Sequence, residues 1–107
     1  TALPMVPTRA DEGWCDAPGH PAYNRPVRLP FSASHETMWR RDGLYDICIV
    51  LDWNMRAGRA RHRGSAIFLH LARPGYAPTE GCIALARRDM AWLLARTDRH
   101  TRLTVLA

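Results

Sequence analysis

Lysine is absent from the 107 residues of this chain, so all 15 of its basic side chains are arginines. No apolar run approaches the roughly 18 residues that a transmembrane helix needs, and we predict no transmembrane segment in these residues. Internal repeats and low-complexity tracts are also lacking. A hydrophobic content of 47% argues against intrinsic disorder, and the length predicts one small globular domain spanning residues 1–107.

Cysteine is scarce, and its three positions show no paired spacing. Cys15, Cys48 and Cys82 are too few for a disulfide scaffold and form no C-x-x-C motif, which argues against zinc-ribbon and thioredoxin-like classes. A Cys15–Cys48 disulfide would leave Cys82 free, but Cys48 lies among Ile and Val, which favours two unrelated thiols. A metal site of His62, His70 and Cys82 lacks a fourth ligand, so no metal is predicted.

Positive charge exceeds negative charge, with 15 Lys+Arg against 10 Asp+Glu and a formal net charge of +5. Such a surface favours anionic partners such as nucleic acid, an anionic membrane or an acidic wall polymer. The arginines are scattered except for a cluster between Arg56 and Arg63. That cluster resembles a nucleic-acid patch, but its glycine favours a solvated hairpin loop, and we predict no nucleic-acid partner.

The first 44 residues carry six of the eight prolines, which break helices and central strands. A short helix is predicted only at residues 34–41, with Ser34 as its N-cap and Thr37 in its first turn. Trp14 and Trp39 are predicted to cover an exposed face of the sheet. So long a stretch without regular structure points to a functional loop or to a missing packing partner.

The rest of the chain has clearer periodicity. Two largely apolar runs, 45–52 and 65–72, predict strands buried on both faces. A short apolar segment follows at 82–86, then an amphipathic helix at 88–97 with Asp89 in its first turn, and a final strand at 102–106. These elements predict a mainly β domain. Because little in the chain could cover such a sheet, we expect N-terminal strands of the domain to be missing here, removed or carried by a separate chain.

A base and a nucleophile flank one loop: His70 lies in the second predicted strand, and Cys82 follows the loop. A histidine can take the thiol proton, so that the thiolate attacks an acyl carbon. Gly81 permits the tight turn that aims the Cys82 amide at an oxyanion, and the Thr79 side chain can hold that turn. The alternative is a satisfied core histidine and a small buried cysteine, which the spacing alone favours.

These residues carry a resemblance to a known family. The motifs FLHLA at 68–72 and TEGCIAL at 79–85 resemble the active-site signature of the L,D-transpeptidase catalytic domain of YkuD type. That signature is a strand-borne histidine, a loop of variable length, and then Ser/Thr-x-Gly-Cys. Upstream, GWCD at 13–16, YNRPV at 23–27, Trp39, Asp42 and Tyr45 look like one bacterial subgroup of the family. The resemblance extends over residues 13–106 and implies a β-sandwich-like fold with small helices.

The resemblance implies a cysteine acyltransferase that cross-links peptidoglycan stem peptides, one as donor and one as acceptor. Cys82 matches the nucleophile, His70 the general base, and the backbone of Gly81 and Cys82 the oxyanion donors. Thr79 matches the Ser/Thr of the motif. No cofactor is implied, carbapenem-type molecules are implied as inhibitors, and the implied location is the periplasm or cell envelope. Two alternatives stay open: L,D-carboxypeptidase action on the same fold, and a non-enzymatic basic module that binds an anionic polymer.

The sequence departs from the family pattern at three positions near the signature. Glu80 stands where many members have His, Ser or Arg, and Ala84 where many have Arg or Asn. Leu71 follows the histidine at a position where Gly is frequent. These changes remove expected polar contacts, so substrate positioning has to come from other residues.

We expect the remaining substrate contacts to come from polar side chains outside the signature. An arginine holds a carboxylate by two parallel hydrogen bonds, and stem peptides carry free carboxylates. Hydrogen-bonding side chains on a proline-fixed segment are suited to the same purpose. Together with Thr79, the predicted substrate-binding residues are therefore Arg73, Tyr23, Asn24 and Arg25.

Overall fold

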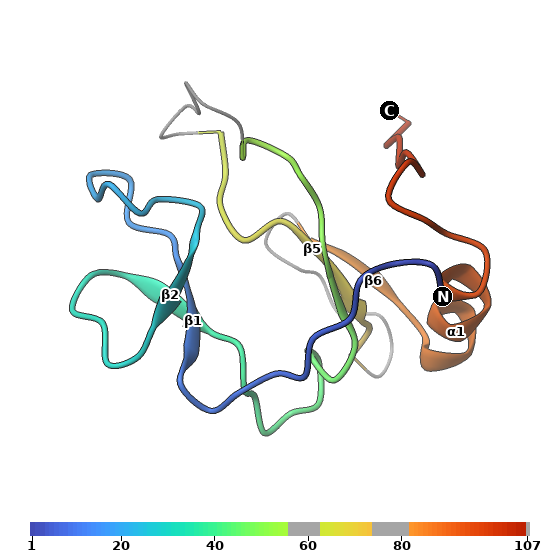
Figure 1. Ribbon diagram of the computed structural model, residues 1–107, viewed down its shortest axis with the longest axis horizontal. Coiled ribbons are helices and arrows are strands. Elements are labelled where there is room, and N and C mark those ends of the chain that lie inside the picture. Colours follow the sequence, from blue (N-terminus) through green and yellow to red (C-terminus); the bar gives the residue numbers. More distant parts are fainter. Residues whose placement is uncertain (56–62, 74–81, 107) are drawn as a thin grey trace.

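The computed structural model describes residues 1–55, 63–73 and 82–106 (Figure 1). Within these residues it contains short strands and one helix, in the order β1 (Glu12–Cys15), β2 (Pro26–Arg28), β3 (His35–Thr37), β4 (Cys48–Val50), β5 (Phe68–Leu71), β6 (Ile83–Leu85) and α1 (Arg87–Leu94). The strands form two three-stranded sheets, ordered β2-β1-β3 and β4-β5-β6. The prediction of a mainly β fold is confirmed.

The first sheet, β2-β1-β3, is antiparallel and lies in the part of the chain that is rich in proline. In β1, Gly13 lies opposite Val27 of β2 and opposite Thr37 of β3. Pro26 begins β2 at the edge of the sheet, where proline is tolerated. The sequence pattern did not predict these strands, because strands of three or four residues between prolines are too short to show alternation.

The second sheet, β4-β5-β6, places β5 between an antiparallel neighbour, β4, and a parallel one, β6. Every residue of β5 is buried, which confirms the buried strand predicted within 65–72. Strand β4 covers only part of the predicted 45–52. The prediction that it is buried on both faces is wrong, because β4 is an edge strand and Val50 is 45% exposed.

Helix α1 covers the second sheet at its C-terminal side (Figure 1). It begins close to the predicted start at residue 88 and ends earlier than the predicted residue 97. Asp89 lies in its first turn, as predicted. Met90 is fully buried and packs with Leu69 and Leu71 of β5, so an apolar face of the helix is held against the sheet.

Two predicted elements are wrong. The predicted helix at 34–41 is replaced by β3, whose backbone pairs with β1, and the Ser34 hydroxyl donates to the Asp16 carboxylate at 2.6 Å. The predicted strand at 102–106 is absent from the described residues, where this segment forms no ladder and Leu106 is 87% exposed. Its apolar pattern fits a strand, but strands form only where a neighbouring strand pairs with them.

A hydrophobic core joins the two sheets. Its buried members are Trp14, Leu44, Tyr45, Ala66 and Phe68. The Trp14 and Tyr45 rings contact the Phe68 ring edge to face, with centroid distances of 5.2 and 5.5 Å. Trp14 is buried, as predicted for a residue that covers the sheet, whereas Trp39 is largely exposed.

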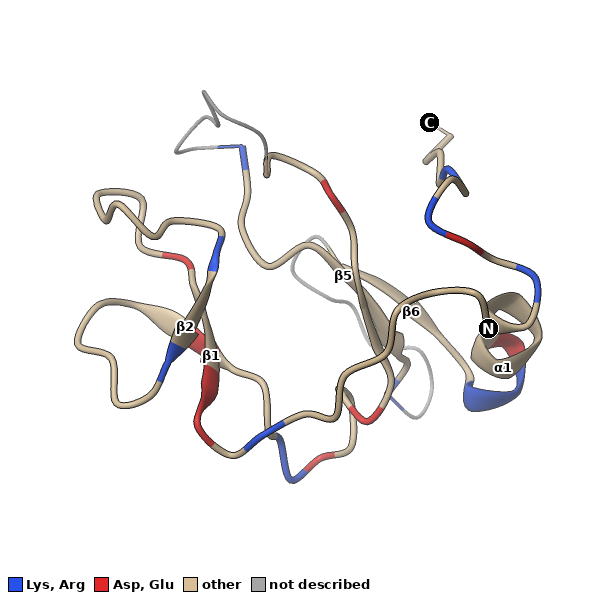
Figure 2. Cartoon of the chain, viewed as in Figure 1, with Lys and Arg blue, Asp and Glu red and all other residues tan. Residues whose placement is uncertain are grey.

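Charged side chains are distributed over the whole described part of the chain. Figure 2 shows basic residues on the first sheet, on α1 and towards the C-terminus, with acidic residues interspersed among them. Arg9 pairs with Asp11 at 3.3 Å, and Arg87 pairs with Asp46 at 3.4 Å. The predicted cluster between Arg56 and Arg63 lies, apart from Arg63, outside the described residues.

Candidate active site

His70 lies in the middle of the second sheet, opposite Cys48 of β4 and opposite Ala84 of β6. Its side chain is 4% exposed. The imidazole Nδ1 donates to the backbone carbonyl of Leu71 at 2.8 Å, and because a carbonyl only accepts, Nδ1 carries the proton in this contact. The neutral imidazole therefore keeps its lone pair on Nε2, the form that a general base needs.

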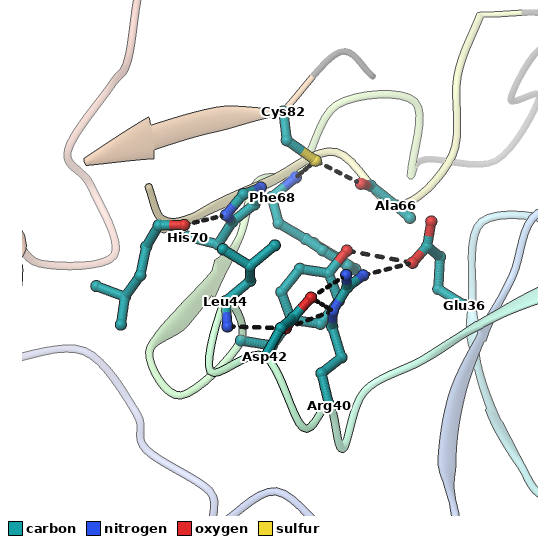
Figure 3. Close-up of polar contacts among 10 residues, drawn as sticks. Glu36, Arg40, Asp42, Leu44, Ala66, Phe68, His70 and Cys82 are labelled. Atoms are coloured by element: carbon teal, nitrogen blue, oxygen red, sulfur yellow. Dashed lines mark hydrogen bonds and ion pairs between the residues drawn. The ribbon is translucent and has the colours of Figure 1, made fainter. Parts of the chain in front are cut away.

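Cys82 directly precedes β6, and its thiol contacts the backbone that leads into β5 (Figure 3). The Sγ–H donates to the carbonyl of Ala66 at 3.2 Å, and the backbone N–H of Phe68 donates to Sγ at 3.5 Å. An N–H directed at sulfur favours the thiolate, whereas the Ala66 carbonyl favours the protonated thiol. These two contacts fix the sulfur at the start of the strand pair.

The register places Cys82 and His70 on the same face of the second sheet. Residues opposite each other in neighbouring strands share a face, as do residues two apart in one strand. His70 lies opposite Ala84, and Cys82 precedes Ala84 by two residues. Cys82 directly precedes β6, so the register makes its side chain a diagonal neighbour of His70 on one face of the sheet.

The environment of Cys82 keeps its thiol protonated at rest. Burial raises the pKa of the thiol, the Phe68 N–H opposes that shift, and the Glu36 carboxylate adds to it. A thiol with a raised pKa is a poor nucleophile until a base removes its proton. A nucleophilic role for Cys82 would therefore require a base such as His70 to remove the proton.

Cys48 and Cys15 are also free thiols, which agrees with the interpretation of unrelated cysteines. Cys48 shares the sheet face of His70, but burial raises its pKa to about 12, and Cys82 and Glu36 act in the same direction. Cys15 is fully buried in β1. Because burial keeps the Cys48 thiol protonated and Cys15 lies in the other sheet, Cys82 remains the candidate nucleophile.

Tyr45 contacts His70 and is linked to Glu36. The sequence analysis did not predict either residue as part of the site. The Tyr45 ring lies against the imidazole with a centroid distance of 5.4 Å, and its hydroxyl donates to the Glu36 carboxylate at 3.2 Å. Arg40 Nε donates to Asp42 at 3.0 Å, and this hydrogen bond lowers the pKa of Asp42 to about 2. The sequence predicted a helix at 34–41 and a strand from residue 45, and neither implies contact with His70, so only the fold reveals it.

Three of the predicted substrate-binding residues, Tyr23, Asn24 and Arg25, directly precede β2 of the first sheet. Tyr23 and Asn24 are buried, with Asn24 only 1% exposed, and Arg25 Nη1 donates to the Asn24 carbonyl at 3.2 Å. The Asn24 side-chain oxygen accepts hydrogen bonds from the Trp14 indole at 2.9 Å and from the Ala66 backbone at 3.2 Å. These contacts favour a supporting role for Asn24, and a direct contact of these three residues with substrate stays a prediction.

Arg73 lines a pocket of about 670 Å³ at the C-terminal end of β5. The other lining residues are Asp42, Gly43, Leu44, Asp46, Leu71, Ala72 and Arg87. Arg87 is engaged by Asp46, and Asp42 by Arg40, whereas Arg73 makes no ion pair within the described residues. A guanidinium in a pocket beside the His70 strand is suited to hold a carboxylate.

Several predicted site residues lie outside the described part of the chain: Thr79, Gly81, Glu80 and His62. The described residues contain no group of three or more His, Cys, Asp or Glu side chains that could hold a metal ion. They also form no helix long and apolar enough to cross a membrane. What the described residues offer is a thiol, an imidazole with a free Nε2 and backbone groups, which together suit acyl transfer.

Comparison with known families gives one match. The model of the L,D-transpeptidase catalytic domain, YkuD, matches residues 2–105. Comparisons with curated proteins and with solved structures found no match. The family match covers nearly the whole chain, including both the strand that carries His70 and the segment that carries Cys82.

Proposed function

Because this chain belongs to the L,D-transpeptidase catalytic domain family, we propose that it cross-links peptidoglycan stem peptides through a thioester on Cys82. The observation that carries the proposal is the shared sheet face of Cys82 and His70, with the imidazole held by Leu71 as a base. In this proposal residues 1–107 belong to one catalytic domain, whose N-terminal strands are removed or carried by a separate chain, and it acts in the periplasm or cell envelope with no cofactor or metal.

The acylation step begins with transfer of the Cys82 Sγ proton to Nε2 of His70. The sulfur then attacks the carbonyl carbon of the donor stem at the bond between its L centre and the terminal D-residue. Backbone N–H groups of Gly81 and Cys82 hold the oxyanion. The C–N bond breaks, the imidazolium gives its proton to the leaving amine, and a thioester remains on Sγ.

The deacylation step decides between two activities of the same site. An amine of a second stem peptide loses its proton to His70, attacks the thioester carbon and expels the Cys82 thiolate, which forms the cross-link. Water in place of that amine gives L,D-carboxypeptidase action instead. A non-enzymatic basic module is less well supported, because the described arginines are scattered or paired with carboxylates.

Mass spectrometry of a purified disaccharide-tetrapeptide incubated with the protein tests the proposed function. A cross-linked dimer with loss of one terminal D-residue is the expected product, and fragmentation locates the new bond. Loss of the D-residue without a dimer would replace transpeptidation by carboxypeptidase action. No reaction, together with binding of an anionic polymer that weakens steeply with salt, would overturn both in favour of a binding module.

We also propose that Arg73 holds a free carboxylate of the stem peptide. Its guanidinium lines the pocket at the end of β5 without an ion pair in the described residues. A lost charge-assisted hydrogen bond costs about 1.5–3 kcal/mol, so Arg73→Ala is expected to raise KM about 10- to 100-fold while kcat stays within about threefold. Steady-state kinetics on the tetrapeptide measures both constants.

The matched control for Arg73 is Arg88→Ala. Arg88 lies in the first turn of α1, and its side chain is 92% exposed, outside the pocket. The same loss of one positive charge at Arg88 is expected to leave KM unchanged. Equal KM increases in the two variants would mean that general electrostatic attraction, rather than a carboxylate site at Arg73, holds the substrate.

A further inference from the structure

We propose that Tyr45 is a positioning residue for His70, held in place by Glu36 of the opposite sheet and by Arg40. The inference rests on the proposed function only in naming His70 as the base. Its physical content is that the ring of Tyr45 fixes the orientation of the imidazole. Three sets of contacts support it.

The first set is the direct contact between the two rings. Tyr45 and His70 are both buried, and their ring centroids lie 5.4 Å apart at an interplanar angle of 61°. The Leu71 carbonyl fixes the imidazole at Nδ1, but one hydrogen bond leaves the ring free to rotate about that contact. An aromatic ring packed against the imidazole removes this freedom and leaves Nε2 aimed in one direction.

The second set tethers Tyr45 itself. Its hydroxyl donates to the Glu36 carboxylate at 3.2 Å, and Glu36 belongs to β3 of the first sheet. The Arg40 guanidinium lies over the Tyr45 ring, 4.9 Å from its centroid, and its Nη1 lies 3.9 Å from Glu36. Figure 3 shows the Glu36 and Arg40 side chains pointing toward each other. The first sheet is thus connected to His70 through the Tyr45 ring.

The third set closes the connection through the backbone. Asp42, held by Arg40, accepts from the Leu44 N–H at 3.1 Å. The Leu44 carbonyl in turn accepts from the Leu71 N–H at 3.0 Å. The carbonyl of Leu71 is the group that accepts the hydrogen bond from His70 Nδ1–H. Residues 36–45 therefore support both contacts that orient the imidazole. The Tyr45 ring packs against it, and the Leu44 carbonyl holds the backbone of Leu71.

The charged and titratable groups that face this pair come from every neighbouring element. Glu36 comes from β3, Arg40 and Asp42 from the connection to β4, Cys48 from β4 and Cys82 from the start of β6. Burial raises the pKa of Tyr45, and Glu36 adds to that shift, so the Tyr45 hydroxyl keeps its proton and donates throughout the neutral range. The hydrogen bond from Tyr45 to Glu36 therefore persists over the neutral pH range in which Cys82 and His70 are proposed to exchange a proton.

The test compares Tyr45→Leu with Tyr45→Phe. Leucine removes the ring, whereas phenylalanine keeps the ring and removes only the hydroxyl. Tyr45→Leu is expected to lower kcat about 10- to 100-fold with KM within about threefold, because loss of orientation affects the chemical step. Tyr45→Phe keeps the ring but loses the tether to Glu36, and it is expected to lower kcat only about three- to tenfold. Nitrogen-15 NMR of the imidazole is expected to show one Nδ1–H tautomer in the unmodified protein and exchange between tautomers in Tyr45→Leu.

Met90→Ala is the matched control, since Met90 is fully buried beneath β5 but belongs to the other core cluster. It is expected to lower stability without changing the His70 nitrogen signals. If Tyr45→Leu behaves like Met90→Ala, with lower stability and unchanged His70 signals, Tyr45 is a core residue only and the inference is wrong.

If Tyr45→Leu fails to fold, Glu36→Gln carries the same test, because Glu36 is partly exposed. Its weaker acceptor is expected to loosen Tyr45, to lower kcat about three- to tenfold and to broaden the His70 signals. Unchanged signals in Glu36→Gln would overturn the inference. The NMR measurement needs no substrate, so a protein that fails to cross-link but shows these changes would overturn the proposed function and leave the role of Tyr45 intact.

Discussion

Cys82→Ser is expected to lower the rate of donor turnover about 1,000-fold or more while leaving the fold intact. A serine hydroxyl occupies nearly the same space and can make the same contacts with Ala66 and Phe68. Its proton is far harder to remove than that of a thiol, and a single imidazole does not generate enough alkoxide to replace the thiolate. The environment that already raises the pKa of Cys82 would disfavour the alkoxide further.

Intact-protein mass spectrometry separates this effect from a loss of binding. The unmodified protein, quenched during turnover, is expected to carry an acyl adduct on Cys82, and Cys82→Ser to carry none. Cys48→Ala is the matched control, because Cys48 shares the sheet face of His70 but stays protonated, with a pKa raised to about 12. An adduct that persists in Cys82→Ser and disappears in Cys48→Ala would show that Cys48, and not Cys82, is the nucleophile.

Strand β5 and helix α1 could be predicted because each has a clear local pattern of apolar residues. Strand β5 consists entirely of buried residues, and α1 repeats apolar residues at helical spacing, so each appears as a pattern. The segment 102–106 has an equally good apolar pattern but forms no strand among the described residues. Pairing depends on a neighbouring strand, which a local pattern does not report.

The first sheet escaped prediction for the opposite reason. Strand β3 pairs with β1 more than twenty residues upstream, and its three residues carry no apolar alternation. The candidate site shows the same division. His70 and Cys82 were predictable because they flank one loop in a recognisable motif, whereas Tyr45 and Glu36 are brought to His70 only by the packing of the two sheets.

Asn24→Gly is expected to lower the free energy of unfolding by about 3–5 kcal/mol, because the side chain uses every one of its hydrogen-bonding positions. Its oxygen accepts from Trp14 and Ala66, and its amide donates to the carbonyls of Trp53 at 3.0 Å and Asn54 at 2.8 Å. Removing it leaves the buried N–H groups of the Trp14 indole and the Ala66 backbone without this partner. A small domain has only about 5–15 kcal/mol of stability in total, so this loss is severe.

Thermal unfolding followed by circular dichroism measures the effect, and the midpoint is expected to fall by roughly 15–30 °C. The choice of glycine matters because Asn24 has a φ of 58°, which glycine adopts without strain. Asn24→Ala adds that strain and is expected to cost about 1 kcal/mol more. The difference between the two variants separates the backbone strain from the lost hydrogen bonds.

Asn54→Gly is the matched control for the hydrogen-bond network. Asn54 has nearly the same φ, 56°, but is only half-buried, and its amide donates to the Gly64 carbonyl at 3.1 Å. Its replacement is expected to cost about 1 kcal/mol, because water can reach the groups that it leaves. Equal losses in Asn24→Gly and Asn54→Gly would show that the buried Asn24 amide does not hold the first sheet against the segment leading into β5. In that case the hydrophobic contact between Trp14 and Phe68 would be the main connection between the sheets.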